Sequence, residues 1–160
     1  MNMKDLFSVL LPQRVIPFAT YTTTQTGTVI DLAAAGLQGG IFKSALLMID
    51  AGIGGITFSG TNSITIELQD SDDNSTFADV DITKVNGLTD TSLTGGVIKS
   101  WTAAKAAATL NAIGYRGGKR YVKVIANFNG THGTGTPLGV WAILGDSGYH
   151  PVQATVAVAN

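Results

Sequence analysis

The chain has 160 residues, of which 44% are hydrophobic and only 13% are charged, and its formal net charge is -1 at pH 7. This length suits one domain with a sizeable core, and the balanced charge argues against the broad basic surface that nonspecific nucleic-acid binding requires. No cysteine is present, which excludes disulfide bonds and thiolate metal sites. With so few charged residues, the surface must consist largely of small polar and apolar groups, which a protein partner desolvates easily.

Residues 1–17 are expected to form an extended N-terminal arm. An apolar run at 6–11 ends at Pro12, and Pro12 and Pro17 each push the preceding residue towards extended geometry. The run is shorter than the core of a signal peptide, and no stretch of the sequence approaches the roughly 20 apolar residues of a membrane-spanning helix. We therefore expect no secretion signal and no membrane partner, and we expect the arm, including Arg14, to reach a neighbouring subunit.

From Tyr21 onwards the sequence favours short β-strands. Residues 22–30 are dense in β-branched side chains, and residues 42–49 form a short apolar run bounded by glycines. The glycine clusters at 36–40 and 52–55 predict turns or bulges between these strands and the next one.

The next run is the most regular in the sequence. Ile64, Ile66 and Leu68 fall on one face of an extended chain and the residues between them are polar, which is typical of a strand covered on one side. Further strands are expected around Phe77 and Val80 and at residues 95–101, 120–128 and 138–144.

At most one short helix is expected, at residues 102–110, where helix propensity is highest and Thr102 can act as the cap. About seven to nine short strands at fairly regular spacing predict an all-β fold, an antiparallel β-sandwich or jelly roll. We assign residues 18–150 to this domain, and residues 151–160 to a C-terminal tail or an edge strand that pairs with a neighbouring subunit.

Two oppositely charged turns are the candidate functional feature. Five acidic residues fall within residues 69–81, directly after the regular strand, and residues 114–124 carry a cluster of basic residues. The sequence therefore predicts two separated, opposite charge centres on a nearly neutral protein, suited to protein contacts. The candidate interface residues are Asp70, Asp72, Asp73, Arg116, Lys119 and Arg120, together with Arg14 of the arm.

A metal or cofactor site is not expected. Asp70, Asp72, Asn74 and Asp81 match parts of a calcium-loop template, but Ser75 stands where that loop needs glycine and the flanks are strands.

The basic turn also lacks a phosphate site. Gly117-Gly118-Lys119 resembles the end of a phosphate-binding loop, yet the first glycine and the hydroxyl residue of that motif are missing.

Catalytic motifs are missing as well. No G-x-S-x-G or HExxH pattern occurs, and neither His132 nor His150 has a nearby carboxylate at metal-ligand spacing. We therefore expect a protein that is not an enzyme and has no cofactor. Trp101 and Trp141 are expected in the core or an interface, with a sugar-binding surface as the alternative.

Three segments in this order resemble a family of small structural proteins of tailed bacteriophages. They are residues 67–80, residues 114–124 and residues 140–145. The resemblance implies a virion component without catalytic residues, a decoration or cement protein on the outside of an icosahedral capsid, often a trimer. Its partners would be the major capsid protein and copies of itself, after synthesis in the host cytoplasm. The stretches 103–108 and 130–136 depart from the family pattern, which leaves the capsid contact open.

We expect acidic residues of one protomer to face basic residues of another, or of the shell protein. Two other functions remain open at this point. One is a carbohydrate-binding tail or fibre domain, in which exposed aromatic rings would cluster on one face. The other is a head-to-tail connector or tail-tube subunit, which would form a ring.

Overall fold

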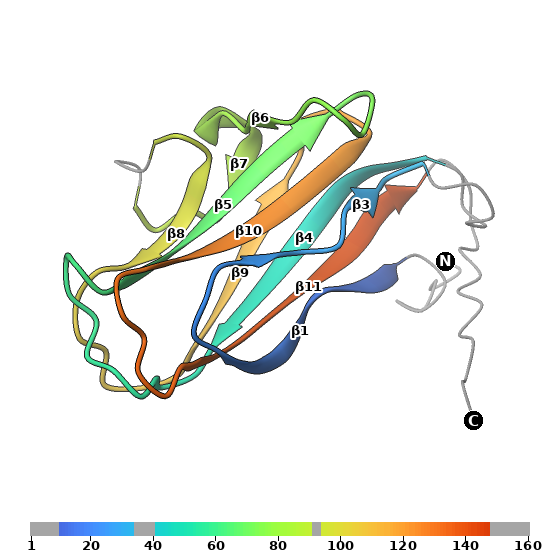
Figure 1. Cartoon of the computed structure of the whole chain (residues 1–160). Helices are drawn as coiled ribbons and strands as arrows, with labels where there is room; N and C mark the ends of the chain where they lie inside the picture. Colours follow the sequence, from blue (N-terminus) through green and yellow to red (C-terminus); the bar gives the residue numbers. More distant parts are fainter. Residues whose placement is uncertain (1–9, 34–40, 91–93, 148–160) are drawn as a thin grey trace.

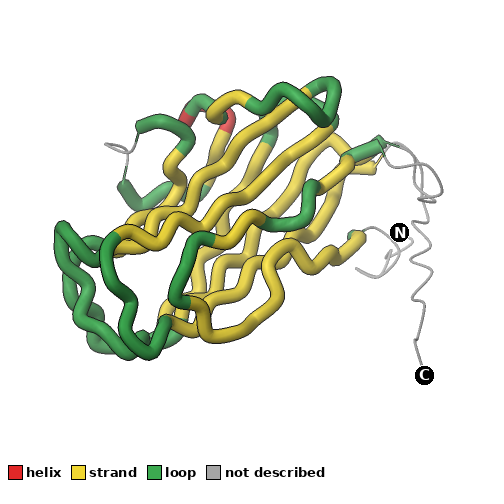
Figure 2. The backbone as a smooth tube through the Cα atoms, viewed as in Figure 1, coloured by secondary structure: helices red, strands yellow, loops and turns green. Residues whose placement is uncertain are grey.

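The structure, a computed structural model, describes residues 10–33, 41–90 and 94–147, and these residues form two antiparallel β-sheets packed face to face (Figure 1). Figure 2 shows that strands and loops make up nearly all of this part, and a single 3-10 turn, η2 (Ile82–Lys84), is its only helical element. The strands are β1 (Leu11–Tyr21), β2 (Gln25–Thr26), β3 (Ile30–Asp31), β4 (Phe42–Ala51), β5 (Ser63–Ser71), β6 (Ala78–Asp79), β7 (Val85–Asn86), β8 (Val97–Trp101), β9 (Thr109–Tyr115), β10 (Tyr121–Asn129) and β11 (Thr136–Ser147).

The two sheets have five and six strands. Sheet A has the order β1-β11-β4-β9-β7, and sheet B has the order β2-β10-β5-β6, with β3 also paired to β10 and β8 to β5. Most neighbours in a sheet are distant in sequence, so the chain crosses repeatedly between the sheets, as it does in β-sandwiches. The expected all-β sandwich is confirmed. None of the described segments is a helix long and apolar enough to cross a bilayer.

The core lies between the sheets and is built by alternation along each strand. In β5 the side chains of Ile64, Ile66 and Leu68 are fully buried, as the sequence predicts. In β4 the same period of two buries Leu47 and Ile49 completely, opposite the inner face of sheet B. The period of two therefore fixes which side chains of each strand form the core.

The structure corrects the boundary expected for the N-terminal arm. Residues 11–17 belong to β1, an edge strand of sheet A that pairs with β11, and Val15 and Ile16 are buried in the core. Proline is accepted in an edge strand because its missing N–H can face away from the ladder. The register shifts near Ile16, and the carbonyl oxygen of Val15 accepts a hydrogen bond from the N–H of Thr28 at 2.9 Å, which ties β1 to the start of sheet B. Residues 1–9 and 151–160 lie outside the described residues.

The helix expected at 102–110 is absent from the described residues. Residues 102–108 form a loop, and β9 begins at Thr109. The packing requirement overrides the helix propensity of the alanines, because Ile113 and Tyr115 of β9 are needed in the core and β4 offers a full ladder for pairing. The long strand expected at 22–30 is likewise reduced to the two short strands β2 and β3.

The core predicts a clear contrast between two leucines. Leu47 is fully buried, whereas Leu110 is 61% exposed on the other face of sheet A. Leu47→Ala should lower the free energy of unfolding by about 2–5 kcal/mol, and Leu110→Ala by less than about 0.5 kcal/mol. Urea denaturation measures both changes. Equal losses in the two variants would contradict the assignment of inner and outer faces.

Candidate interaction surfaces

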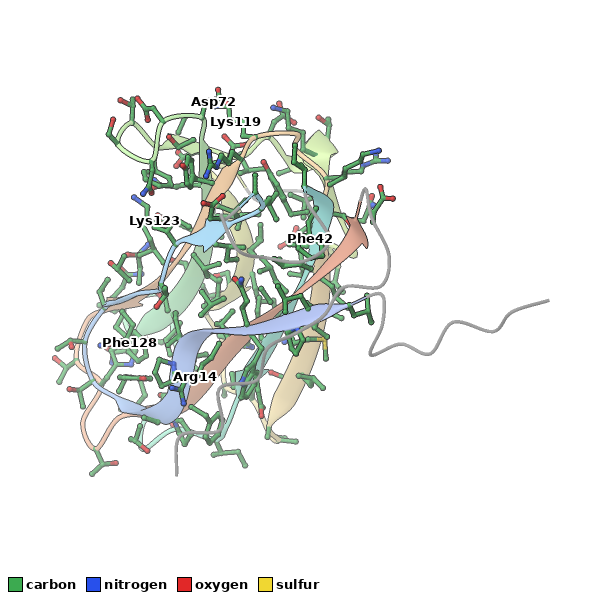
Figure 3. The ribbon with its side chains drawn as sticks, turned by 90° about the vertical axis from the view of Figure 1, so that its right-hand side faces the viewer. Arg14, Phe42, Asp72, Lys119, Lys123 and Phe128 are labelled. Atoms are coloured by element: carbon green, nitrogen blue, oxygen red, sulfur yellow. The ribbon has the colours of Figure 1, made fainter. Side chains whose placement is uncertain are left out.

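The acidic and basic turns lie side by side at one end of the sandwich. The antiparallel ladder between β5 and β10 pairs Ser71 with Tyr121 and Asp70 with Val122, so the end of β5 meets the start of β10. Figure 3 shows Asp72 and Lys119 together at this end, which we call the charged end. The expectation of two separated charge centres is therefore wrong, because the sequence does not reveal that β5 and β10 are partners.

Asp70 is a structural residue of the charged end. Its carboxylate is almost fully buried, accepts a hydrogen bond from the Tyr115 hydroxyl at 3.0 Å and lies 3.1 Å from Lys119 Nζ. Burial, and then the hydrogen bond to Asp70, raise the pKa of Tyr115 above its ordinary value. The hydrogen bond to Asp70 also raises the pKa of Lys119. This cluster joins β5, β9 and the turn before β10, so Asp70 and Lys119 face each other within one chain.

Asp73 organises the acidic turn. Its Oδ1 accepts hydrogen bonds from the backbone N–H groups of Ser75 at 2.9 Å and Thr76 at 2.8 Å, and from the Ser71 hydroxyl at 2.8 Å. These donors, led by the Thr76 N–H, hold the pKa of Asp73 well below its usual range. Asp72 beside it is exposed and accepts no hydrogen bond within the described residues.

The remaining basic residues also contact their own chain. Arg120 donates two hydrogen bonds to the carboxylate of Asp31, at 2.8 and 2.9 Å, and this contact lowers the pKa of Asp31. The side chain of Arg116 is exposed, and within the described residues its guanidinium donates only a long hydrogen bond, 3.4 Å, to the carbonyl oxygen of Thr83. Among the candidate residues at the charged end, Asp72 and Arg116 are therefore the two that are exposed without a strong partner in their own chain.

The residues of the calcium template are used separately. Asp70 binds Lys119, and Asp81 caps η2 by accepting hydrogen bonds from the N–H and hydroxyl of Thr83. In the part of the chain that the structure describes, no three His, Asp or Glu side chains group as metal ligands. His132 is buried, with Nε2 2.9 Å from the carbonyl oxygen of Asn129.

A second surface, the outer face of sheet A, has very different chemistry. We define this face by twelve positions in three rows that run across β1, β11, β4 and β9. They are Pro12, Ile143, Leu46 and Gly114; Arg14, Trp141, Met48 and Ala112; and Phe18, Gly139, Asp50 and Leu110. Arg14 thus lies on this face, far from Asp72 and Lys119 (Figure 3).

The outer face of sheet A is mainly apolar, and Arg14 and Asp50 are its only charged members. Five large hydrophobic side chains are strongly exposed among the described residues, and three of them are on this face: Phe18, Leu46 and Leu110. Such clustering on one side of a small domain is typical of a surface that is covered in an assembly.

Two aromatic rings form the centre of this surface. Phe18 stacks on Trp141 with ring centroids 6.3 Å apart and planes 9° from parallel. Phe18 can lie flat on the sheet because Gly139 has no side chain, since a Cβ there would be 2.9 Å from Phe18 Cδ2. The glycine therefore creates room for an exposed aromatic platform.

The outer face of sheet B is mainly polar, although Tyr121 and Ile125 of β10 also lie on it. Thr65, Glu67 and Gln69 of β5 lie there beside Lys123 of β10. Several of its groups have partners on the same chain, since Gln69 donates to Asp79 at 3.0 Å and the Lys123 ammonium lies 4.1 Å from the centre of the Phe77 ring. The two outer faces of the sandwich therefore differ sharply in chemistry.

The sequence carries a signal for the apolar face in two of its strands. The runs 45–49 and 140–144 are apolar at consecutive positions, which is normally read as a strand buried on both faces. Here one of the two faces is exposed.

Comparisons with known proteins give no family assignment. No protein-family model and no curated protein matches the sequence. Among solved structures, the SPBc2 prophage-derived protein YomS is similar over 88% of this chain and 98% of its own, with 12% identity and a TM-score of 0.38. The Tobacco streak virus coat protein, solved as a dimer, is similar over 99% of both chains, with 10% identity and a TM-score of 0.33. Scores this low give no support to a functional assignment.

The acidic turn predicts a pH-dependent difference between two adjacent residues. A lowered pKa means that the ionised Asp73 stabilises the fold above its unfolded pKa, about 3.9, and that this contribution is lost as the pH falls through the lower folded value. Asp73→Asn should therefore lower the urea midpoint at pH 7, and the difference from the parent protein should shrink as the pH falls below about 4. Asp72→Asn, which removes the same charge without losing a hydrogen bond, should have a much smaller effect at pH 7. A constant difference at all pH values would contradict this role.

Proposed function

We propose that this chain is a non-enzymatic virion structural protein that binds and stabilises a bacteriophage capsid lattice, as decoration or cement proteins do. The observation that carries the proposal is the contrast between the apolar outer face of sheet A and the polar outer face of sheet B. A domain that works alone in water gains nothing from an exposed apolar sheet, whereas an assembly protein buries it against a partner. The resemblance of residues 67–80, 114–124 and 140–145 to tailed-phage structural proteins supplies the virion context.

In this proposal the protein sits on the capsid surface and its partners are the major capsid protein and further copies of itself, for which the resemblance implies a trimer. The shell contact uses the charged end. Because Asp70, Lys119 and Arg120 already have partners on their own chain, the groups that remain for a charged shell contact are Asp72 and Arg116. Exposed charges of this kind contribute more to specificity and association rate than to affinity.

Stabilisation of the shell follows from mass action. A protein that binds the assembled lattice and not its separated subunits shifts the equilibrium towards the lattice by RT ln(1 + [L]/Kd). Many weak contacts repeated over the shell are sufficient for this effect, because each bound copy bridges subunits that would otherwise separate.

The proposal is tested by locating the protein in purified particles of the phage that encodes it. Mass spectrometry should detect the chain in particles banded on a density gradient, and electron cryomicroscopy should place it on the outside of the shell. Particles made without it should release their DNA at a lower temperature. Absence of the chain from particles, or a position confined to the tail, would overturn the capsid role.

A charge variant tests the shell contact. When the Arg116→Glu variant is added to shells assembled without this protein, fewer copies should bind than of the parent protein. The reason is that the variant reverses an exposed charge at the proposed contact. Lys99→Glu, the same charge change at a half-buried position of β8, is the matched control and should leave occupancy unchanged. Arg120→Glu is less suitable because it also breaks the ion pair with Asp31. Equal occupancy of the Arg116 variant and the parent protein would exclude the charged end as the contact.

The stacked pair of Phe18 and Trp141 favours one second candidate, a carbohydrate-binding tail or fibre domain. Exposed aromatic rings bind the apolar faces of sugars, and Arg14 beside Trp141 could bond a hydroxyl group. A glycan array distinguishes the two functions. Binding that is lost in Trp141→Ala would support the sugar site, whereas an array without signal, together with shell binding, would support the lattice protein.

A further inference from the structure

The outer face of sheet A has no partner within the described part of the chain. The face is mainly apolar, and it carries one positive and one negative side chain. Neither Arg14 nor Asp50 forms a salt bridge in the described part of the chain. The positive charge of Lys105 interacts with Asp50 at longer range, but the Lys105 ammonium forms no ion pair with it. It donates a hydrogen bond to the carbonyl oxygen of Ala51 instead, at 2.8 Å.

We propose that this face binds the same face of a second copy of the chain, in a two-fold pair in which Arg14 of each copy meets Asp50 of the other. The inference deepens the proposed function, on which it rests for its biological setting, by naming the partner of the apolar face. It replaces the trimer that the family resemblance implies.

Charge complementarity is the first argument for a second copy. Arg14 is level with Trp141 and Met48 across the sheet, and Asp50 follows Met48 by two residues. With strands about 4.8 Å apart and about 3.4 Å per residue, the two charged residues are about 12 Å apart. A two-fold axis in the plane of the contact, perpendicular to the line between the two residues and through its midpoint, brings each Arg14 opposite Asp50 of the second copy, so that the contact contains two Arg14–Asp50 pairs.

The position of the aromatic rings is the second argument. Trp141 is on β11, the strand between β1 and β4, so the axis passes close to it and the Trp141 side chains of both copies meet near the centre of the contact. Phe18 extends this centre on each copy. Large aromatic side chains at the middle of an interface, with arginine beside them, are the usual carriers of binding energy.

The size of the outer face of sheet A sets the expected affinity of the pair. Four strands and three rows span roughly 20 Å in each direction, an area of roughly 400 Å², which is about half of the roughly 800 Å² that each partner buries in a standard interface. We therefore expect a pair of micromolar affinity in solution, which would be reinforced when many copies are held close together on a lattice.

A charge-exchange experiment on the full chain tests the pair. Analytical ultracentrifugation from about 1 µM to about 500 µM should show a reversible species with twice the 16.5 kDa mass of one chain, a range that brackets micromolar affinity. Arg14→Glu and Asp50→Arg should each weaken the pair by about tenfold or more, because like charges then face each other. The double variant should regain most of the parent affinity. Glu67→Lys, which reverses a charge on the outer face of sheet B, should change nothing.

Other outcomes have definite meanings. A monomer over the whole range, a trimer, or single variants that weaken association without recovery in the double variant would each overturn the two-fold pair. Dimerisation that requires residues 1–9 would show that the N-terminal segment makes the contact, and would overturn the two-fold pair too.

A chain that is monomeric in solution but present on shells would leave the virion role standing, whereas a dimer absent from particles would refute that role and leave the pair intact. Circular dichroism confirms that each variant is folded.

Discussion

Strand β4 lies at the middle of sheet A, paired with β11 on one side and β9 on the other, and its register determines both the core and the outer surface. Successive side chains of a strand point to opposite faces, so burial of Leu47 and Ile49 inside forces Leu46 and Met48 to the outside. A slip of one residue would exchange the two sets. Because both sets are apolar, hydrophobic patterning selects this register less strongly than it does in β5. The neighbouring strands β11 and β9 bring uncharged, mainly apolar residues to the same face, and β1 brings Pro12 and Phe18 together with Arg14.

The charged end holds sheet B against sheet A. Asp70 of β5 is held by Tyr115 of β9 and by Lys119 of the following turn, so one buried carboxylate links a strand of sheet B to a strand of sheet A. A buried charge is tolerated only when it is paired and hydrogen-bonded, and Asp70 has both kinds of partner. The same contact removes Asp70 and Lys119 from the groups available to another protein. Many of the charged residues that the sequence places in these two turns thus hold the fold together and are not free to bind a partner.

The sequence predicts those strands in which the alternation of apolar and polar residues matches the buried and exposed faces of the folded sheet. The sequence predicts strand β5 because its polar outer residues contrast with Ile64, Ile66 and Leu68. The sequence does not predict strand β9, because the alanines before it favour a helix. It does not predict β1 either, because two prolines suggest a break, although an edge strand tolerates them. The ion pairs of the charged end join residues that are far apart in sequence, as Arg120 and Asp31 are, and depend on strand pairing that local patterns do not encode. For the same reason, the sequence indicates Arg14 as an interface residue but not the apolar face around it.

Sheet A is better suited to association through its outer face than through its two edge strands. Unpaired strand edges readily add further strands, and proteins commonly protect them with prolines or with very short terminal strands. In sheet A one edge is β1, which contains Pro12 and Pro17, and the other is β7, which has only two residues. Both terminal strands are therefore poor templates for further strand pairing. The exposed apolar area instead faces outwards around Trp141, where burial gains roughly 25 cal/mol for each Å² removed from water. A sandwich with protected edges and one apolar face associates through side chains rather than through its backbone, and this limits how many neighbours each copy can bind.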